Sequence, residues 1–354
     1  DKSSRPVVVF AGAGGKTSAM FRLARELAGQ SEVVVTASSH LGVWQIPLAD
    51  RRVAAEAAQE VELKGKGVTL VTGAVEGDRI KPIDGVSLNL LREKGKNQPF
   101  PLLIEADGSR QKPLKAPAAH EPPIPEFADL AIYVAGLTAL GKPLTDEYVH
   151  RAEFFSRLGG IPLGDPVTPQ AIVKVLAHPQ GGLKNIPSGA RRVAFLNQAD
   201  SPQLQSIGGD MARELLGHFD AVLVGSLQNS TLHAFERTAG IILAAGESTR
   251  FGAPKQLLEW KGKPFVRQVA ETALKSGLEP VIVVTGFHAA EVESALNGLP
   301  ALIVHNPDYR QGQGTSIRAG LASLSDKVGA AVFLLADQPQ IPVEAVRALV
   351  ESHG

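Results

Sequence analysis

Two short segments of this 354-residue sequence place glycines and basic side chains directly after an apolar run. Residues 7–18 read VVVFAGAGGKTS, and residues 241–255 read IILAAGESTRFGAPK. Because glycine has no side chain, it lets backbone N–H groups approach a phosphate closely. Both segments therefore predict binding of a nucleoside triphosphate, at two places in one chain.

The first segment carries the groups that hold a triphosphate together with Mg²⁺. Lys16 can reach the terminal phosphates, and the Thr17 hydroxyl can ligate Mg²⁺ at the start of the following helix. A standard Walker loop would have glycine where Phe10 stands, so a tight glycine turn with a surface lysine is the alternative. The glycines expected to approach the phosphates are Gly12, Gly14 and Gly15.

Two further strand ends fit the same site. In LLIEADG, Glu105 and Asp107 follow a buried strand, where a carboxylate can hold Mg²⁺ directly or through water. In VAFLNQAD, Asn197 and Asp200 have the N-x-x-D spacing with which many G-protein-like folds recognise a purine. We therefore expect this site to bind ATP or GTP. The alternative for Glu105 and Asp107 is a solvated carboxylate in a loop, and the alternative for Asn197 and Asp200 is a capped turn.

The second segment combines with two later stretches of sequence. Arg250 offers a planar fork to phosphate oxygens and Lys255 a movable charge. Asp337, in LLADQP, ends a core strand where Mg²⁺ bridging a triphosphate would be anchored. The stretch HNPDYRQGQGTSIRAGL opens a helix whose N-terminus can face an anion or a base. The remaining predicted contacts are Leu243, Ala244, Ala245, Gly246, Gly314 and Ser316.

The segments that position these residues alternate between strand and helix patterns. β-branched apolar runs that end in small polar residues alternate with amphipathic stretches, first up to about residue 226 and again from Gly240. This pattern predicts parallel sheets buried on both faces. The expected fold is α/β with two doubly wound, mainly parallel-sheet domains. They are a P-loop-like NTP-binding domain at 1–236 and a Rossmann-like nucleotidyltransferase domain at 237–354.

Composition excludes several other classes of function. Formal net charge is zero, so nothing favours nucleic acid or an anionic membrane as a partner. The apolar runs are too short to cross a bilayer, and the chain opens DKSSRP without a signal segment, so we expect a cytoplasmic protein. There is no cysteine, which excludes disulfides, thiolate metal sites and cysteine nucleophiles.

Four stretches in the first part of the chain resemble the YqeC family. They read GAGGKTS, IEADGSRQKPLKAPAAHEPPIP, VAGLTALGKPLTDEYVHRAE and LNQAD. The resemblance implies an NTP-binding maturation factor that is accessory to selenium-dependent molybdenum hydroxylases, with a hydroxylase apoenzyme as partner. Each histidine in these stretches could instead be a surface or internally satisfied residue. Candidate ligand contacts are Arg110, Lys112, Lys115, His120 and His150.

The later part of the chain resembles the MobA-like nucleotidyltransferases, most closely the MocA group, through LAAGESTRFG, HNPDYRQGQGTSIRAG and LADQP. That group transfers CMP from CTP to molybdopterin-bound molybdenum and releases pyrophosphate. The resemblance implies catalytic roles for Arg250, Lys255 and Asp337, with Mg²⁺ at Asp337. Family members usually continue beyond this point, so we expect the second domain to be C-terminally incomplete. The alternatives are another small-molecule nucleotidyltransferase, or a non-catalytic nucleotide-dependent chaperone that delivers the cofactor.

Overall fold

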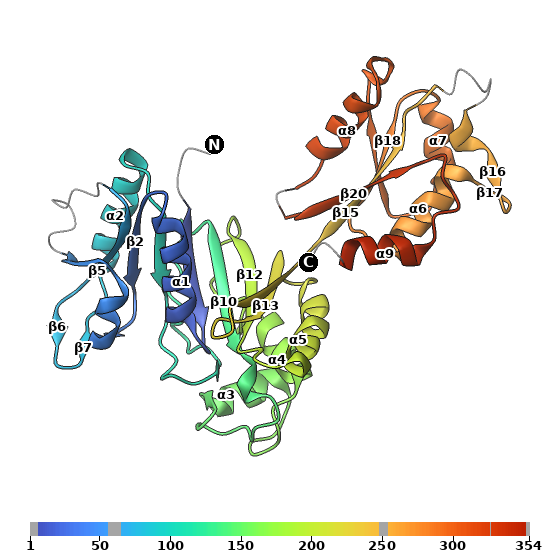
Figure 1. Ribbon diagram of the computed structural model, residues 1–354. Coiled ribbons are helices and arrows are strands. Elements are labelled where there is room, and N and C mark those ends of the chain that lie inside the picture. Colours follow the sequence, from blue (N-terminus) through green and yellow to red (C-terminus); the bar gives the residue numbers. More distant parts are fainter. Residues whose placement is uncertain (1–5, 56–64, 248–253, 326, 352–354) are drawn as a thin grey trace. The chain divides into compact units, whose positions relative to one another are not determined.

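The computed structural model describes residues 6–55, 65–247, 254–325 and 327–351. The chain divides into two units, Asp1–Phe235 (unit 1) and Glu236–Gly354 (unit 2) (Figure 1). Each unit contains its own sheet and its own hydrophobic core. The predicted α/β fold with large parallel sheets is confirmed at this level.

Unit 1 is built on a nine-stranded sheet in which neighbouring strands from β13 to β4 run parallel. In β1, VVVFAG, all six residues are buried, as expected for a strand covered on both faces. In sheet order the strands are β14 (Thr231–Glu236), β13 (Ala221–Ser226), β12 (Arg191–Asn197), β10 (Leu130–Gly136), β1 (Val7–Gly12), β8 (Leu102–Glu105), β2 (Glu32–Ala37), β5 (Gly67–Thr72) and β4 (Arg51–Ala54).

The order in which the chain adds strands to this sheet reverses beside β1. From β1 it proceeds outward to β2 and returns to β8; it then crosses to β10 on the other side of β1. In doubly wound sheets, ligands bind outside the carboxyl ends of the strands at such a crossing. The carboxyl end of β1 is the glycine loop, so the topology places this loop at the expected binding position.

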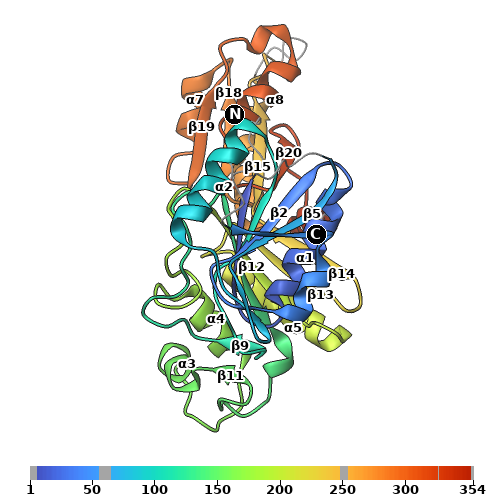
Figure 2. The ribbon, with the colours of Figure 1, turned by 90° about the vertical axis from the view of Figure 1, so that its left-hand side faces the viewer.

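Helices cover both faces of the unit 1 sheet. On one face, Met20 and Ala24 of α1 pack with Phe10 and Val35. The other face is covered by α2 and by the cluster that includes α3, α4 and α5, so α1 and α2 lie on opposite sides in Figure 2. The helices are α1 (Lys16–Ala28), α2 (Gly85–Asn97), α3 (Ala152–Gly159), α4 (Pro169–Ala177) and α5 (Pro202–Leu215).

Several short elements of unit 1 carry no periodic pattern and were not expected from the sequence. A parallel pair formed by β9 and β11 anchors the loop that follows β8. The others lie mainly between β2 and β8. These elements are β3 (Leu41–Gly42), η1 (Val43–Leu48), β6 (Val75–Glu76), β7 (Arg79–Ile80), β9 (Leu114–Lys115), η3 (Leu137–Ala139) and β11 (Val149–His150).

Unit 2 contains a four-stranded parallel sheet in the order β19 (Ala301–His305), β18 (Val281–Thr285), β15 (Thr238–Ala244) and β20 (Ala330–Leu335). Helices α6, α7 and α9 pack on one face and α8 on the other. A Cβ at Gly320 would lie 2.6 Å from Ile241 Cγ2, so this glycine lets α8 approach the sheet. The remaining elements are η4 (Lys255–Leu257), β16 (Glu259–Trp260), β17 (Lys263–Pro264), α6 (Phe265–Lys275), α7 (Ala289–Ala295), η5 (Tyr309–Gln311), α8 (Gln313–Ala322) and α9 (Val343–Glu351).

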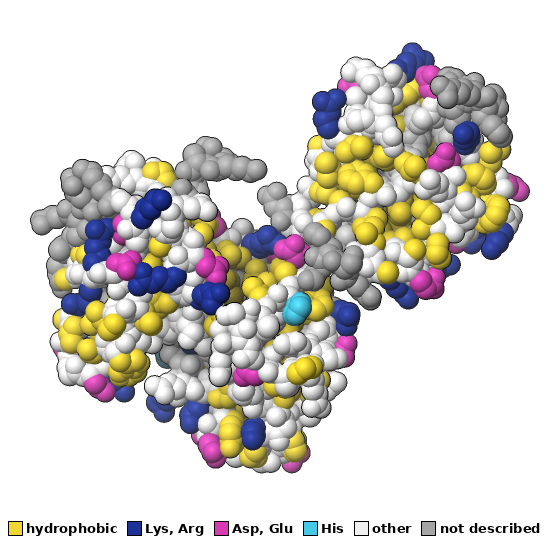
Figure 3. All heavy atoms as spheres, viewed as in Figure 1, with side chains coloured by type: hydrophobic (Ala, Val, Ile, Leu, Met, Phe, Trp, Pro, Cys, Tyr) yellow, Lys and Arg dark blue, Asp and Glu magenta, His cyan; other side chains and the backbone are white. Residues whose placement is uncertain are grey.

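The surface carries charges of both signs. The sequence has 36 basic and 36 acidic residues, and on the face shown in Figure 3 the two kinds are interspersed. An interspersed surface of this kind lacks the single-sign field that attracts a polyanion. No helix in the described part of the chain is long and apolar enough to cross a membrane.

Candidate functional site

Unit 2 contains a cavity of about 440 Å³ beside the ends of β15 and β20. Its walls come from the end of β15 and the residues that follow it (Leu243–Gly246), the start of α8, and the end of β20 with the turn after it, together with Lys255 and Gln256. Small-molecule sites commonly occupy about 300–1,000 Å³ and lie at the carboxyl ends of parallel strands. The three segments that the sequence analysis singled out in this unit thus contribute to one cavity.

The predicted catalytic residues of unit 2 are placed as follows. Lys255 and Asp337 both line the cavity, and Asp337 is exposed on the turn after β20. Arg250 lies outside the described residues. Among the predicted contacts, Ser316 lines the cavity, whereas Gly314 is not among the lining residues.

The sequence analysis missed two side chains that shape this cavity. Gln256 is buried, and its Nε2 donates to the carbonyl oxygen of Gly246 at 3.2 Å, which steadies the loop after β15. Tyr309 forms another part of the wall. A Cβ at Gly286 would lie 2.7 Å from Tyr309 Cβ, so the ring can lie there only because residue 286 is glycine. Gly286, which follows the strand VIVVT, was the one sequence feature that could have indicated a large side chain such as Tyr309 at this position. No sequence feature indicated that Gln256 is buried beside the cavity.

In unit 1 the glycine loop packs tightly against β10. Gly12, Gly14 and Gly15 have φ values of 93°, 79° and 115°, a backbone region that favours glycine. A Cβ at Gly14 would lie 2.4 Å from the backbone nitrogen of Gly136, so no side chain fits there. Asn197 Nδ2 donates to the carbonyl oxygen of Gly14 at 2.8 Å. The Asn197 side chain therefore braces the loop.

The first residues of α1 contact the carboxylates at the end of β8. Lys16 is buried; its Nζ donates to the Gly12 carbonyl oxygen at 2.6 Å and lies 3.6 Å from Asp107 Oδ1. Thr17 Oγ1 donates to Glu105 Oε2 at 2.6 Å. Burial raises the pKa of Glu105, although Lys16 and the Thr17 hydrogen bond oppose this change. The strand ends predicted to form one site in unit 1 are therefore in direct contact.

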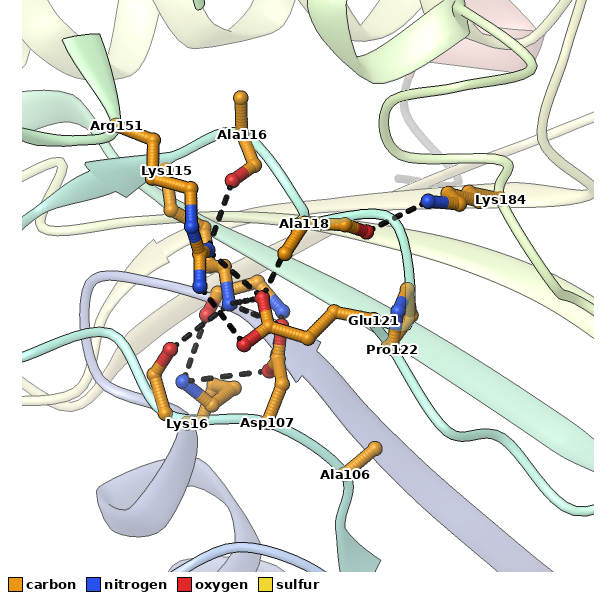
Figure 4. Close-up of polar contacts among 12 residues, drawn as sticks. Lys16, Ala106, Asp107, Lys115, Ala116, Ala118, Glu121, Pro122, Arg151 and Lys184 are labelled. Carbon is orange, nitrogen blue, oxygen red and sulfur yellow. Dashed lines mark hydrogen bonds and ion pairs between the residues drawn. The ribbon is translucent and has the colours of Figure 1, made fainter. Parts of the chain in front are cut away.

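Behind this contact lies a largely buried network of acidic and basic side chains, which we call the Lys115 network: Asp107, Lys115, Glu121 and Arg151 (Figure 4). Lys115 Nζ donates to Asp107 Oδ2 at 2.6 Å, to the Gly108 carbonyl oxygen at 2.8 Å and to Glu121 Oε2 at 2.8 Å. An ammonium group has three donors, so Lys115 has none left for a ligand. The expectation that Lys115 contacts a ligand does not fit this arrangement.

The network also lowers the pKa of the Glu121 carboxyl group. Burial alone would raise the pKa of Glu121, but hydrogen bonds from Arg151 and Lys115 lower it to about 2. Asp107 Oδ1 accepts the backbone N–H of Gly12 at 3.1 Å. Asp107 thus links the glycine loop to Lys115, and both of its oxygens are occupied by protein donors.

The other predicted contacts of unit 1 lie around this centre. Arg110 is exposed and has a left-handed backbone, with φ of 50°. The Lys112 carbonyl oxygen accepts the Gly14 N–H at 3.1 Å, which places the loop after β8 against the glycine loop. His120 and Asp200 are exposed, and Asp200 accepts a hydrogen bond from the Ser226 hydroxyl.

His150 gives unit 1 a predicted dependence of stability on pH. Burial, followed by the charges of Arg151 and Lys115, lowers its pKa from 6.5 to about 4. An unfolded chain takes up this proton near pH 6.5 and the folded unit only near pH 4, so the free energy of unfolding should fall as the pH drops between these values. Hydrogen exchange at pH 7.5 and pH 5 measures this change. His150→Gln should reduce it and His120→Gln should not; an unchanged dependence in His150→Gln would refute the assignment.

Each unit has residues that could ligate Mg²⁺ together with a nucleotide. Within the described ranges, no group of three or more His, Asp or Glu residues could hold a metal ion alone. Mg²⁺ that is bound with a nucleotide needs only one or two protein ligands besides phosphate oxygens and water. Thr17 with Glu105 meets this requirement in unit 1, and Asp337 meets it in unit 2. Asp107, the other predicted ligand in unit 1, accepts one hydrogen bond at each oxygen, from Gly12 and from Lys115.

Comparison with known proteins relates each unit to a family. The YqeC protein family matches residues 8–153, and the MobA-like NTP transferase domain matches residues 240–354. Uncharacterized protein YqeC of Escherichia coli (strain K12) is 32% identical over 234 residues, which cover 63% of this chain and 89% of that protein. The chain belongs to the YqeC family. Unit 2 adds a MobA-like NTP transferase domain, so both resemblances noted in the sequence are confirmed.

The relatives of unit 2 are longer than the part that matches. Nicotine blue oxidoreductase of Paenarthrobacter nicotinovorans is 40% identical over 115 residues, which are 32% of this chain and 56% of that protein. The crystal structure of Rv0371c from Mycobacterium tuberculosis H37Rv aligns at 28% identity and a TM-score of 0.30, over 33% of this chain and 60% of that one. The chain thus spans a little over half the length of these relatives.

Proposed function

We propose that unit 2 transfers a cytidylyl group from CTP to a molybdopterin-type cofactor and releases pyrophosphate. The observation that supports this proposal is one cavity in unit 2, lined by the segment Leu243–Gly246, the start of α8, Lys255 and Asp337. The resemblance to the MocA group favours CTP, because Ala245 stands where the guanylyl-transferring group tends to have glycine.

In the proposed reaction, the terminal phosphate of the acceptor attacks the α-phosphorus of CTP. A new P–O bond forms, the bond between the α-phosphorus and its bridging oxygen breaks, and pyrophosphate leaves with the electron pair. Lys255 offsets the charge that develops on pyrophosphate, and Arg250 is assigned the same role. Asp337 would hold Mg²⁺, which when bound neutralises part of the triphosphate charge. Positioning and electrostatic stabilisation provide the catalysis, without a covalent intermediate.

The assay for this proposal measures pyrophosphate release with each of the four NTPs, in the presence and absence of a molybdopterin acceptor. We expect release with CTP that depends on the acceptor. Because one relative of unit 2 is named as an oxidoreductase, the fold by itself does not fix the reaction. Tight CTP binding without turnover would instead support a nucleotide-dependent chaperone that delivers the cofactor.

We further propose that unit 1 binds ATP or GTP with Mg²⁺ and acts as an accessory factor for a selenium-dependent molybdenum hydroxylase. Support for nucleotide binding comes from the glycine loop at the carboxyl end of β1 and from the adjacent Thr17 and Glu105. Lys16 would leave the Gly12 carbonyl oxygen, only 2.6 Å away, to reach the phosphates. The proposed partner is the hydroxylase apoenzyme.

The Lys16→Ala variant tests nucleotide binding by unit 1. We expect its affinity for MgATP and MgGTP to fall at least about a hundredfold, because charge-assisted hydrogen bonds to phosphate are lost. Titration calorimetry of the full chain measures both affinities. Affinity for CTP, which reports on unit 2, should stay unchanged and serves as the internal control. ATP and GTP binding equal to that of the wild type would reject the assignment.

A further inference from the structure

In unit 1, the end of β12 is bonded both to the glycine loop and to the loop after β13. Asn197, the last residue of β12, is buried; its Nδ2 donates to the Gly14 carbonyl oxygen at 2.8 Å, and its Oδ1 accepts the Leu227 N–H at 3.3 Å. A backbone N–H can only donate and a carbonyl oxygen can only accept, so these contacts fix both ends of the amide. The loops at the carboxyl ends of β1, β12 and β13 are therefore joined directly.

Asp200 lies in the loop after β12 and is held by the loop after β13. Its Oδ1 accepts the hydroxyl proton of Ser226, which is buried at the end of β13. Ser226 Oγ itself accepts the backbone N–H of Asn229 at 3.0 Å. Asn229 Nδ2 also donates to the Asp200 carbonyl oxygen at 3.2 Å. Asp200 is thus fixed through its side chain and through its backbone.

The other carboxylate oxygen of Asp200 is available to a ligand. Among the residues that the structure describes, Oδ2 accepts no hydrogen bond and forms no ion pair, and Asp200 is exposed. A carboxylate only accepts, and it has room for about four hydrogen bonds. Asp200 can therefore accept two N–H groups of a ligand while it keeps its contact with Ser226.

The position of Asp200 suits the base of a nucleotide whose phosphates lie at the glycine loop. Thr17 and Glu105, which are proposed to hold Mg²⁺, lie toward β8 on one side of β1, whereas β10, β12 and β13 follow on the other side (Figure 1). Neighbouring strands are about 5 Å apart, so β12 and β13 lie about 10–15 Å from β1. A nucleotide with its phosphates and Mg²⁺ at the glycine loop can therefore place its base beside Asp200.

We propose that unit 1 selects GTP over ATP, and that Asp200 is the residue that recognises the base. The inference rests on the proposed binding of a nucleotide by unit 1. Guanine presents two adjacent donors, N1–H and the 2-amino group, and one carboxylate can accept both. Adenine presents the lone pair of N1 beside its 6-amino group, and this lone pair would face a carboxylate oxygen. A site whose polar groups are left unpaired by the wrong ligand discriminates strongly against it.

The other two common bases fit Asp200 no better than adenine. Cytosine has an acceptor, N3, beside its 4-amino group, and uracil has a single N–H between two carbonyl oxygens. Neither base offers the two neighbouring donors that a carboxylate can accept together. Asp200 is therefore matched to guanine among the four bases.

The test measures the affinities of the full chain for GTP, ATP and XTP, the nucleotide of xanthine, which has a carbonyl oxygen in place of the 2-amino group of guanine. The titrations contain MgCl₂ and excess CTP to occupy unit 2, and binding that Lys16→Ala removes is assigned to unit 1. The wild type should bind GTP at least about tenfold more tightly than ATP or XTP. Asp200→Asn should prefer XTP to GTP, because its amide keeps an acceptor for N1–H and offers a donor to the carbonyl oxygen at position 2.

The Asp210→Asn variant is the matched control. Asp210 is an exposed carboxylate on α5 that pairs with Arg213, so its replacement should leave the preference for GTP unchanged. A purely structural role for Asp200 would weaken all three nucleotides equally and would create no preference for XTP. Equal wild-type affinities for GTP and ATP, or an Asp200→Asn variant that still prefers GTP or binds none of the three, would overturn the inference alone. If the wild type shows no nucleotide binding that depends on Lys16, the proposed nucleotide site of unit 1 is itself rejected.

Discussion

The Asp337→Asn variant is expected to release pyrophosphate from CTP at least about a hundredfold more slowly than the wild type. Asp337 is the acidic side chain among the described residues that line the cavity, at the carboxyl end of β20. Asparagine keeps the shape of the side chain but removes the charge that would hold Mg²⁺. The rate is measured at saturating CTP, acceptor and MgCl₂, so that a change in CTP affinity does not enter the result.

The Asp308→Asn variant provides the control for this experiment. Asp308 is an exposed carboxylate on the loop before α8, and its Oδ1 accepts a hydrogen bond from Gln311 rather than facing the cavity wall. Its rate should lie within about twofold of the wild type, since surface substitutions of this kind have small effects. An Asp337→Asn enzyme that retains the full CTP-dependent rate would show that the metal is held elsewhere.

The Lys115→Met variant is expected to lower the free energy of unfolding of unit 1 by about 3–5 kcal/mol. The side chains of Lys115 and Asp107 have no exposed surface, and that of Glu121 is only 14% exposed. Methionine fills a similar volume but leaves two buried carboxylates without their shared cation. Hydrogen exchange of peptides from β1, β8 and β10 reports the unfolding of unit 1 within the full chain.

A lysine on the surface of the same unit serves as the control. It separates the effect of removing a buried charge from the effect of removing an exposed one. Lys174 is exposed on α4, so Lys174→Met should change the stability by no more than about 0.5 kcal/mol. The loss in Lys115→Met should also be smaller at pH 5 than at pH 8, because the stranded carboxylates can take up protons at the lower pH. A loss of less than about 1 kcal/mol at pH 8 would contradict the role assigned to the network.

Elements with a strong local pattern could be predicted from the sequence. β1, β2, β5 and β8 are short apolar runs, several of them rich in valine, and each forms a strand where the pattern placed it. Helix α2, GVSLNLLREKGKN, was missed because only Leu88 and Leu91 are buried along it. The two-residue strands are too short to produce any period, so no local signal could have revealed them.

The contacts of the candidate sites could be predicted only in part. Strand ends such as Glu105 and Asp337 were found because parallel strands end at one edge of a sheet. Hydrogen bonds between residues far apart in the sequence could not be predicted, because no local pattern connects the two partners. Arg151 and Glu121 are 30 residues apart, and Asn197 and Gly14 are 183 residues apart. Lys115 was expected to contact a ligand because it lies in a stretch that resembles the YqeC family, whereas in the structure its ammonium group donates to three acceptors within the protein.

A crystal structure of the full chain with CTP and Mg²⁺ tests the central claim most directly. We expect the nucleotide in the cavity of unit 2, in contact with Ser316 and with its phosphates next to Lys255 and Asp337. A nucleotide bound outside this cavity, or a triphosphate directed away from Asp337, would contradict the assignment of unit 2 as the site of cytidylyl transfer.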